Sequence, residues 1–240
     1  MENPVKKCTE LENIGGGYLV DEQLWLVMEY MDGGTLSNFI GKTQMSENEM
    51  AALSWECLQG LDFLHWTHVI HRDVKSCNIL LRRDSFVKLA DFGLSAQLTL
   101  SKNQWCSGIG IPWWMAPEVE MCQPCGPKGD IWSFGIVEIE MAEEVPHRSK
   151  SSLLAQVLIA TGGAPQLQQP KLFSPWLRDF LSCCLQRDEA WRWSAKELLQ
   201  VKCKGAAGER ASEGWAPPPL KSKASEESPS SSLPILVLFT

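Results

Sequence analysis

The stretch from His71 to Asn78 reads H-R-D-V-K-S-C-N, and the tripeptide Asp91-Phe-Gly93 follows, thirteen positions after Asn78. Ala116-Pro-Glu118 begins another 25 residues along the chain. A three-residue match such as D-F-G is weak by itself, because short matches are common. The eight-residue stretch, the D-F-G and the A-P-E are together very hard to obtain by chance in this order and spacing. They therefore decide the expected fold.

Three side chains in these motifs have the chemistry that transfer of a phosphoryl group to a hydroxyl requires. One carboxylate orients the attacking hydroxyl and accepts its proton, while an amide oxygen and a second carboxylate hold Mg²⁺ on the phosphates of ATP. Asp73, Asn78 and Asp91 supply these groups in the order that the reaction pattern needs. Asn78 and Asp91 would form an all-oxygen site of the kind that Mg²⁺ favours.

The motifs and the stretches around them resemble the serine/threonine protein kinases of the sterile-20 group, and within it the small-GTPase-activated PAK kinases. The resemblance runs from Tyr18 to Gln200. The stretches specific to the group are Trp25–Tyr30, Gly33–Gly34, Asp91–Gln97, Trp114–Glu118, Asp130–Ser133, Leu158–Thr161 and Ser194–Gln200.

The resemblance implies a role for each residue at the centre of the site. Asp73 would act as the proton acceptor, and Lys75 would contact the transferred phosphate. Asn78 and Asp91 would hold Mg²⁺. The ATP-binding residues would be Glu29, Tyr30, Met31 and Leu80. The structural residues would be His71, Arg72, Phe92, Gly93 and Asp130, together with Glu118 and Arg192 as a buried ion pair.

The residues between Asp91 and Glu118 would form the activation segment. Alignment on Trp114–Glu118 places Ser107 at the position of the family's phosphorylated threonine. A phosphate there would add roughly −1.5 to −2 charge and pair with Arg72. The alternative interpretation is an unmodified serine in a loop.

The fold class that follows is α+β and mainly α, with a protein-kinase-like C-terminal lobe and a remnant of the small β lobe. We expect residues 1–31 to form the small-lobe remnant and hinge, 32–200 the helical lobe, and 201–240 a disordered tail. The tail is rich in Ser, Pro, Lys, Glu and Gly, so it has too little apolar surface to offset its ordering entropy.

Local patterns predict the individual elements. Tyr18–Val20 and Leu24–Met28 read as a hairpin, and Ile79–Leu81 and Phe86–Leu89 as short strands. Ser46–Glu49 is a capping box before an amphipathic helix. Ile131–Met141 is apolar on nearly all faces, as in a buried helix. Further helices are expected to start at Ser152, Ser174 and Ser194.

Bulk properties exclude several classes of protein. The net charge is −7 with no basic stripe, so a nucleic-acid partner is not expected. Nine cysteines and a start without a signal-peptide pattern predict a cytoplasmic chain with reduced thiols. No apolar stretch reaches the length of a membrane span. Cys122-x-x-Cys125 and Cys183-Cys184 suggest zinc, but no histidine completes a ligand set.

Several features depart from the kinase pattern. A complete small lobe needs roughly 60 residues before the hinge, whereas 27 precede Met28. Gly15–Gly17 is not a G-x-G-x-x-G loop and reads as a weakened strand, and Lys6 and Lys7 have no apparent strand around them. Ile111 replaces a threonine, and Cys77 an aspartate. Unexpected tryptophans stand at positions 105, 191 and 193.

Three interpretations stay open. The chain is an ATP-dependent serine/threonine kinase of the PAK type, with weak or absent activity because the phosphate clamp is missing. Alternatively, it is a catalytically dead pseudokinase-like module that binds a protein substrate or kinase partner. The third interpretation is a truncated product without activity. A small-GTPase signalling context is expected only from the resemblance.

Overall fold

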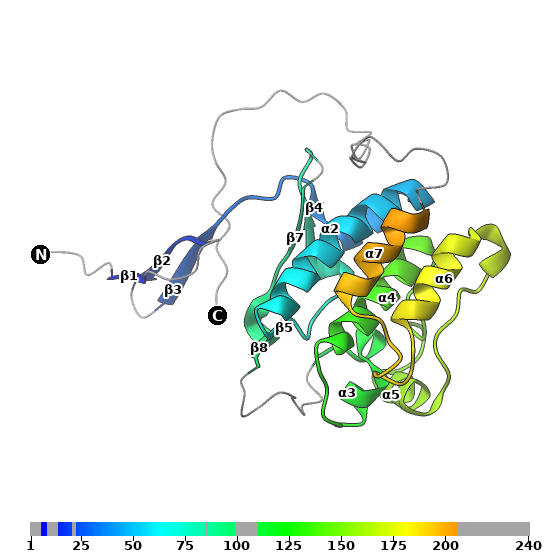
Figure 1. Cartoon of the computed structure of the whole chain (residues 1–240). Coiled ribbons are helices and arrows are strands. Elements are labelled where there is room, and N and C mark those ends of the chain that lie inside the picture. The colour runs from blue at the N-terminus through cyan, green and yellow to red at the C-terminus, as the bar shows by residue number, and fades with distance from the viewer. Residues whose placement is uncertain (1–5, 9–13, 21–22, 85, 99–109, 206–240) are drawn as a thin grey trace, which may run out of the picture. The chain divides into compact units, whose positions relative to one another are not determined.

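The computed structural model describes residues 6–8, 14–20, 23–84, 86–98 and 110–205. The chain divides into two compact units, one of Met1–Asp32 with Lys221–Thr240 and the other of Gly33–Leu220. Figure 1 shows the described helices and strands of both.

The described part of the first unit is a three-stranded antiparallel sheet with strand order β1-β2-β3. Its strands are β1 (Lys6–Cys8), β2 (Ile14–Val20) and β3 (Gln23–Met28). The predicted hairpin is confirmed, with Tyr18 opposite Trp25 and Val20 opposite Gln23. The expectation that Lys6 and Lys7 lack a strand context is wrong, because both pair with β2. The glycine triplet lies inside β2, where the register shifts between Ile14 and Gly16.

The second unit is mainly helical and begins with β4 (Gly34–Thr35) and α1 (Leu36–Ile40). Its longest described helix is α2 (Glu47–Trp66). The predicted capping box is confirmed: the Ser46 hydroxyl accepts the Glu49 N–H, and the Glu49 carboxylate accepts the Ser46 N–H at 2.9 Å. The apolar stripe expected on α2 faces the core, with Met50, Leu53, Cys57 and Leu61 buried and Leu64 partly buried.

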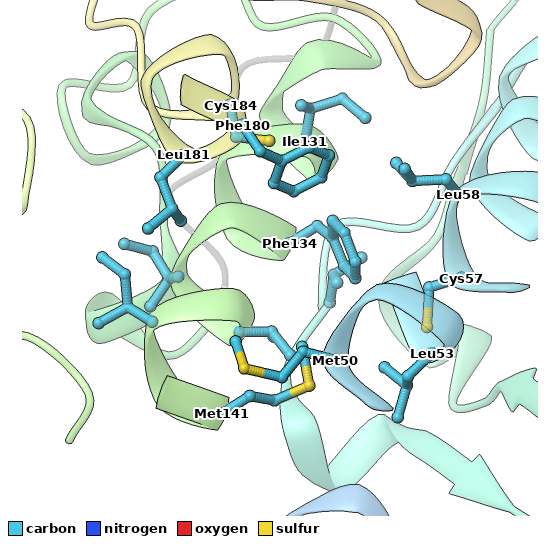
Figure 2. Packing of buried hydrophobic residues seen from close by; sticks show 14 of the residues in the cluster. Met50, Leu53, Cys57, Leu58, Ile131, Phe134, Met141, Phe180, Leu181 and Cys184 are labelled. Atoms are coloured by element: carbon cyan, nitrogen blue, oxygen red, sulfur yellow. The ribbon is translucent and has the colours of Figure 1, made fainter. Parts of the chain in front are cut away.

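The core of this unit is built around α4 (Lys128–Ala142). Nearly every face of α4 is buried, as the apolar run Ile131–Met141 predicted. Figure 2 shows Phe134 of α4 lying among side chains of α2 and α6 (Pro175–Cys184). Such an all-round apolar contact makes α4 a fixed support for the loops that pack on it.

Short strands and 3₁₀ turns connect α2 to the loops of the candidate site. A three-stranded sheet has the order β4-β6-β7, with β6 (Ile79–Leu81) antiparallel to β7 (Val87–Leu89), as predicted. A second pair joins β5 (Val69–Ile70) to β8 (Ala96–Gln97). The 3₁₀ turns are η1 (Ser76–Asn78), η2 (Phe92–Leu94) and η3 (Pro112–Trp114).

The remaining elements are α3 (Pro117–Glu120), α5 (Ser152–Thr161), η4 (Pro170–Leu172), α6 and α7 (Ala195–Gly205). Helix starts were predicted at Ser152, Ser174 and Ser194. The observed helices α5, α6 and α7 begin within one residue of these positions, each directly after a serine. Helix α7 continues to Gly205, five residues into the segment predicted to be disordered. Residues 201–204 include no helix breaker, so the helix has no local reason to stop before Gly205. The rest of the predicted tail, 206–240, lies outside the described residues.

Candidate active site

The loop after β5 is fixed to the start of α4 through Asp130. The backbone N–H groups of His71 and Arg72 donate to the Asp130 carboxylate at 2.9 and 2.8 Å. His65 of α2 also contacts this carboxylate, at 2.9 Å. Arg72 has a left-handed backbone with φ 67°, which an L-residue adopts only when its surroundings hold it there. Asp130 therefore determines where the H-R-D loop starts.

The imidazole of His71 connects this loop to the D-F-G segment. Its Nδ1 accepts the Asp73 N–H at 3.3 Å, and its Nε2 lies 3.0 Å from the carbonyl oxygen of Ala90. This pair of contacts assigns the proton to Nε2, which donates to Ala90. The ring also lies 4.8 Å from the Phe92 ring, measured between centroids. His71 is fully buried, so both ring nitrogens are satisfied within the protein.

Asp73, Lys75 and Asn78 converge in the second unit. The Lys75 ammonium donates to Asp73 Oδ2 at 2.7 Å. The Asn78 side-chain amide donates to the same oxygen at 2.9 Å and to the Asp73 carbonyl at 2.8 Å. Asp73 and Asn78 are 8 % and 7 % exposed. A carboxylate held by a cation and an amide in a nearly dry site has a fixed orientation, with its charge stabilised.

Asp91 lies on the segment that runs beside Asn78. The Ala90 N–H donates to the Asn78 carbonyl at 2.8 Å, so the two candidate Mg²⁺ ligands are on neighbouring pieces of chain. Asp91 is left-handed with φ 64°, and its Oδ1 accepts the Gly93 N–H at 3.4 Å. Asp91 is exposed. The pair supplies an amide oxygen and a carboxylate, which is the donor chemistry that suits Mg²⁺.

Cys77 directly precedes Asn78 in the sequence, at the position where the resemblance to the family leads us to expect an aspartate. Its Sγ lies 3.8 Å from Asn78 Oδ1. Burial raises the pKa of the Cys77 thiol, although the Lys75 ammonium opposes this effect. The neighbour of the candidate metal ligand is therefore a weak hydrogen-bonding group rather than a second carboxylate.

The residues predicted to bind adenine are divided between the two units. Glu29, Tyr30 and Met31 follow β3 in the first unit, and Leu80 lies on β6 in the second. Leu80 is only half-buried, whereas its neighbours Ile79 and Leu81 are both buried. The alternation directs Leu80 out of the core, as expected for a residue on a binding surface.

Glu118 and Arg192 form a bidentate ion pair at distances of 2.6 and 3.0 Å. Arg192 is 1 % exposed and also donates to the carbonyl oxygens of Gln186 and Lys128, at 3.0 and 2.9 Å. Its guanidinium lies 5.1 Å from the centre of the Trp132 ring. The pair connects the A-P-E segment to the loop before α7.

The candidate phosphorylation site Ser107 lies outside the described residues. The proposed partner of Ser107, Arg72, lies within the described residues, and the Arg72 Nε donates to the Leu94 carbonyl oxygen.

Three further residues singled out in the sequence are also described. Gly93, expected to be structural, donates its N–H to Asp91 Oδ1. Trp191 is 75 % exposed, and Trp193 packs against the core.

Sequence reasoning missed a buried carboxylate that contacts the turn η1, which directly follows Asp73 and Lys75. Glu140 accepts the Ser76 hydroxyl at 2.7 Å and the Trp114 indole N–H at 3.2 Å. The signal was present, because Glu138 and Glu140 are acidic residues inside an otherwise apolar helix. A charge in such a position needs partners, but the sequence alone does not say which.

Comparison with known proteins identifies the family of the chain. Residues 7–203 match the family described as "Protein kinase domain". The chain is 51% identical over 195 residues to serine/threonine-protein kinase PAK 1 of Mus musculus, a match that covers 81% of this chain and 36% of PAK 1. It is 47% identical over 191 residues to serine/threonine-protein kinase STE20 of Eremothecium gossypii, covering 79% of this chain and 20% of that protein. With serine/threonine-protein kinase pak-1 of Caenorhabditis elegans the identity is 44% over 194 residues, covering 80% and 34%.

The chain therefore belongs to the protein kinase domain family, with a helix-rich form of that fold. Within the family it is of the STE20/PAK serine/threonine type. It spans about a fifth to a third of the length of these curated relatives.

Two features are absent from the described residues. None of their helices is both long and apolar enough to cross a membrane. They also contain no cluster of three or more His, Cys, Asp or Glu side chains that could hold a metal ion.

Proposed function

We propose that this chain carries the phosphoryl-transfer half of a serine/threonine protein kinase, with protein hydroxyls as substrates and Mg²⁺-bound ATP as phosphate donor. The observation that carries the proposal is the convergence of Lys75 and Asn78 on the Asp73 carboxylate within 2.9 Å. The names and sequence identities of the curated relatives support the same reaction.

Each residue has a distinct part in this proposal. Asp73, held by its two partners, orients the substrate hydroxyl and accepts its proton. Lys75 places a positive charge where the transferred phosphate carries negative charge. Asn78 and Asp91 offer oxygen ligands to Mg²⁺, which when bound would neutralise charge on the phosphates. Glu29, Tyr30, Met31 and Leu80 remain our candidates for the adenine site.

The proposal extends to domains, regulation and location. The division at Asp32 and Gly33 supports a boundary near residue 31 between a small-lobe remnant and the helical lobe. Residues 201–240 would form a tail whose described portion ends at Gly205.

Ser107 would be the phosphorylation site that pairs with Arg72. A cytoplasmic location fits the nine cysteines. A small-GTPase signalling context rests on the resemblance to the PAK group alone.

The turnover of this chain is expected to be low. The 240 residues contain neither a G-x-G-x-x-G motif nor a V-A-I-K motif. Correct positioning of the phosphates lowers the activation barrier by roughly 7–11 kcal/mol in favourable cases. Asp73 and Asp91 by themselves do not orient the terminal phosphate.

The test is transfer of ³²P from Mg²⁺-ATP to a basic serine peptide. Wild type is compared with Asp73→Asn and Asp91→Ala under identical conditions. We expect a signal that each substitution lowers about 100- to 10,000-fold, or to background. Equal signals from all three proteins would show that the activity does not come from this site.

A pseudokinase-like module is the second candidate, favoured by Ile111 and Cys77. Ile111 is partly exposed and has no hydroxyl to bond to the catalytic loop, and Cys77 replaces a carboxylate. This candidate predicts a cooperatively folded protein that captures a kinase substrate without ³²P transfer. An unfolded or aggregated chain would instead support the truncated-product interpretation.

A further inference from the structure

Glu140 is a buried carboxylate that connects two segments bordering the candidate active site. Its Oε1 accepts the hydroxyl of Ser76, in the turn η1, and its Oε2 accepts the indole N–H of Trp114, in η3. Glu140, Ser76 and Trp114 are 8 %, 2 % and 8 % exposed. One side chain of α4 therefore satisfies a donor from the catalytic loop and a donor from the segment before A-P-E.

The same helix holds the other end of the catalytic loop. Asp130, in the first turn of α4, accepts the backbone N–H groups of His71 and Arg72. Ten residues separate Asp130 from Glu140, which corresponds to about 15 Å along a helix axis. The loop between Arg72 and Ser76 contains Asp73 and Lys75. It is thus tied at both ends to carboxylates of one rigid, buried helix.

The contacts continue from Ser76 to the reacting groups. Ser76 opens the turn η1, and Asn78 closes it, with the Asn78 N–H donating to the Lys75 carbonyl at 2.9 Å. The Asn78 amide then donates to Asp73 Oδ2. A displacement of Ser76 would therefore shift Asn78, and with it the orientation of the Asp73 carboxylate.

Fold stability alone is a poor explanation for a carboxylate at this position. A buried ionic group is often no better for stability than a well-packed apolar side chain of similar volume. Burial raises the pKa of Glu140, and the hydrogen bonds from Ser76 and Trp114 oppose this shift, as does the charge of Arg148. The Arg148 guanidinium lies 5.8 Å from the centre of the Trp114 ring. The cluster therefore has a cost in desolvation that a positioning function would explain.

We propose that Glu140 is a positioning residue, which sets the catalytic loop against the Trp114 segment by accepting hydrogen bonds from Ser76 and Trp114. This inference rests on the proposed kinase function for its effect on turnover. Its effect on the loop itself does not depend on that function.

Two substitutions of Glu140 distinguish the loss of its two hydrogen bonds from the loss of its negative charge. Glu140→Ala removes both acceptors. Glu140→Gln keeps both hydrogen bonds, because the amide oxygen accepts from Trp114 and the amide nitrogen donates to the Ser76 hydroxyl. The matched control is Glu143→Ala. The Glu143 carboxylate also accepts two N–H groups, those of Gln168 and Gln169 at 2.7 and 3.0 Å, and both of these partners lie outside the H-R-D loop.

Hydrogen exchange measured on the full chain is the readout that does not require activity. We expect Glu140→Ala to speed exchange of the Asn78 and Ala90 amides about tenfold or more, which corresponds to roughly 1.4 kcal/mol of local opening. Glu140→Gln should restore slow exchange, and Glu143→Ala should leave these amides unchanged. Equal exchange in Glu140→Ala and Glu143→Ala would overturn the proposal, as would a failure of Glu140→Gln to restore it.

Kinetics test the consequence for the reaction. If wild type transfers ³²P, Glu140→Ala should lower kcat about 10- to 100-fold with little change in the KM for ATP, and Glu140→Gln should recover most of it. An unchanged kcat would contradict a positioning role. If wild type transfers nothing, the proposed function fails, while the exchange data still decide the role of Glu140. Should Glu140→Ala not fold, Ser76→Ala and Trp114→Phe each remove one donor and give the same comparison.

Discussion

The side-chain amide of Asn78 donates two hydrogen bonds to Asp73, with its nitrogen 2.8 Å from the Asp73 carbonyl oxygen and 2.9 Å from the carboxylate. Because both hydrogen bonds use the amide nitrogen, the amide oxygen faces away from Asp73. The candidate Mg²⁺ ligand is therefore oriented by the candidate proton acceptor. The two chemical roles assigned to this site depend on one another through this contact.

Asn78→Ala and Asn78→Asp should destabilise the fold in different ways. The alanine variant loses both hydrogen bonds in a buried site, which costs about 1–3 kcal/mol. The aspartate variant instead brings a second carboxylate against Asp73, and like charges repel strongly at this separation. Urea unfolding should show a penalty for Asn78→Asp that grows between about pH 5 and pH 8. The penalty for Asn78→Ala should vary little with pH, and a similar pH trend in both variants would contradict the contact.

The Glu118–Arg192 pair should matter far more than an exposed pair of the same type. Removing either partner leaves the other charge buried, so Glu118→Ala and Arg192→Ala should each cost about 3–5 kcal/mol. Arg192→Lys should also be costly, because an ammonium cannot form the two parallel bonds to Glu118.

The exposed Arg82–Asp84 pair, with Nε and Oδ1 2.7 Å apart, provides the comparison. Asp84→Ala should leave the free energy of unfolding nearly unchanged, since solvent screens that interaction. Chemical denaturation of all four variants gives the ranking. A loss at Asp84 as large as that at Glu118 would show that burial is not the deciding factor.

Glu120 should make the fold less stable as the pH rises. Burial raises the pKa of its carboxyl above the ordinary 4.5, and its Oε1 is buried without a hydrogen-bond partner among the described residues. The folded chain then binds the proton more tightly than the unfolded chain does. The free energy of unfolding therefore falls as pH rises from 4.5 through the raised pKa.

Glu120→Gln removes that titration. The variant should gain stability relative to wild type at about pH 7 and lose this advantage at about pH 4. Thermal unfolding at the two pH values measures the difference, with the exposed Glu144→Gln as control. A Glu120→Gln effect of the same size at both pH values would mean that the carboxylate is not destabilised by burial.

The residues at the centre of the candidate site could be named from contiguous motifs. Contacts between residues far apart in the sequence could not be predicted. Asp73, Lys75 and Asn78 lie within six positions, so one short stretch names all three. The capping boxes at Ser46 and Ser194 are equally local, and the starts of α2 and α7 follow from them. By contrast, 64 residues separate Ser76 from Glu140, and no pattern in either segment indicates the other.

Strand β1 of the first unit likewise could not be predicted from its own residues. Lys6–Cys8 has no alternation of apolar and polar residues, so it does not read as a strand by itself. It becomes β1 because β2 offers an edge, with Lys6 opposite Leu19 and Cys8 opposite Gly17. Pairing of this kind depends on the partner strand rather than on local propensity.

Two helical glycines should respond in opposite directions to the same substitution. A Cβ on Gly135 of α4 would meet the Cβ of Cys184 and the Cδ2 of Leu185, both at 2.9 Å. A Cβ on Gly60 of α2 would meet only the end of the Leu89 side chain, at 3.3 Å. Alanine gains about 1 kcal/mol over glycine in a helix interior, but overpacking a core costs about 1–3 kcal/mol. Gly135→Ala should therefore destabilise the fold by lifting α6 from α4, and Gly60→Ala should be neutral or stabilising. Midpoints of urea unfolding for both variants decide this, and a stabilised Gly135→Ala would show that α4 and α6 are less closely packed than their contact implies.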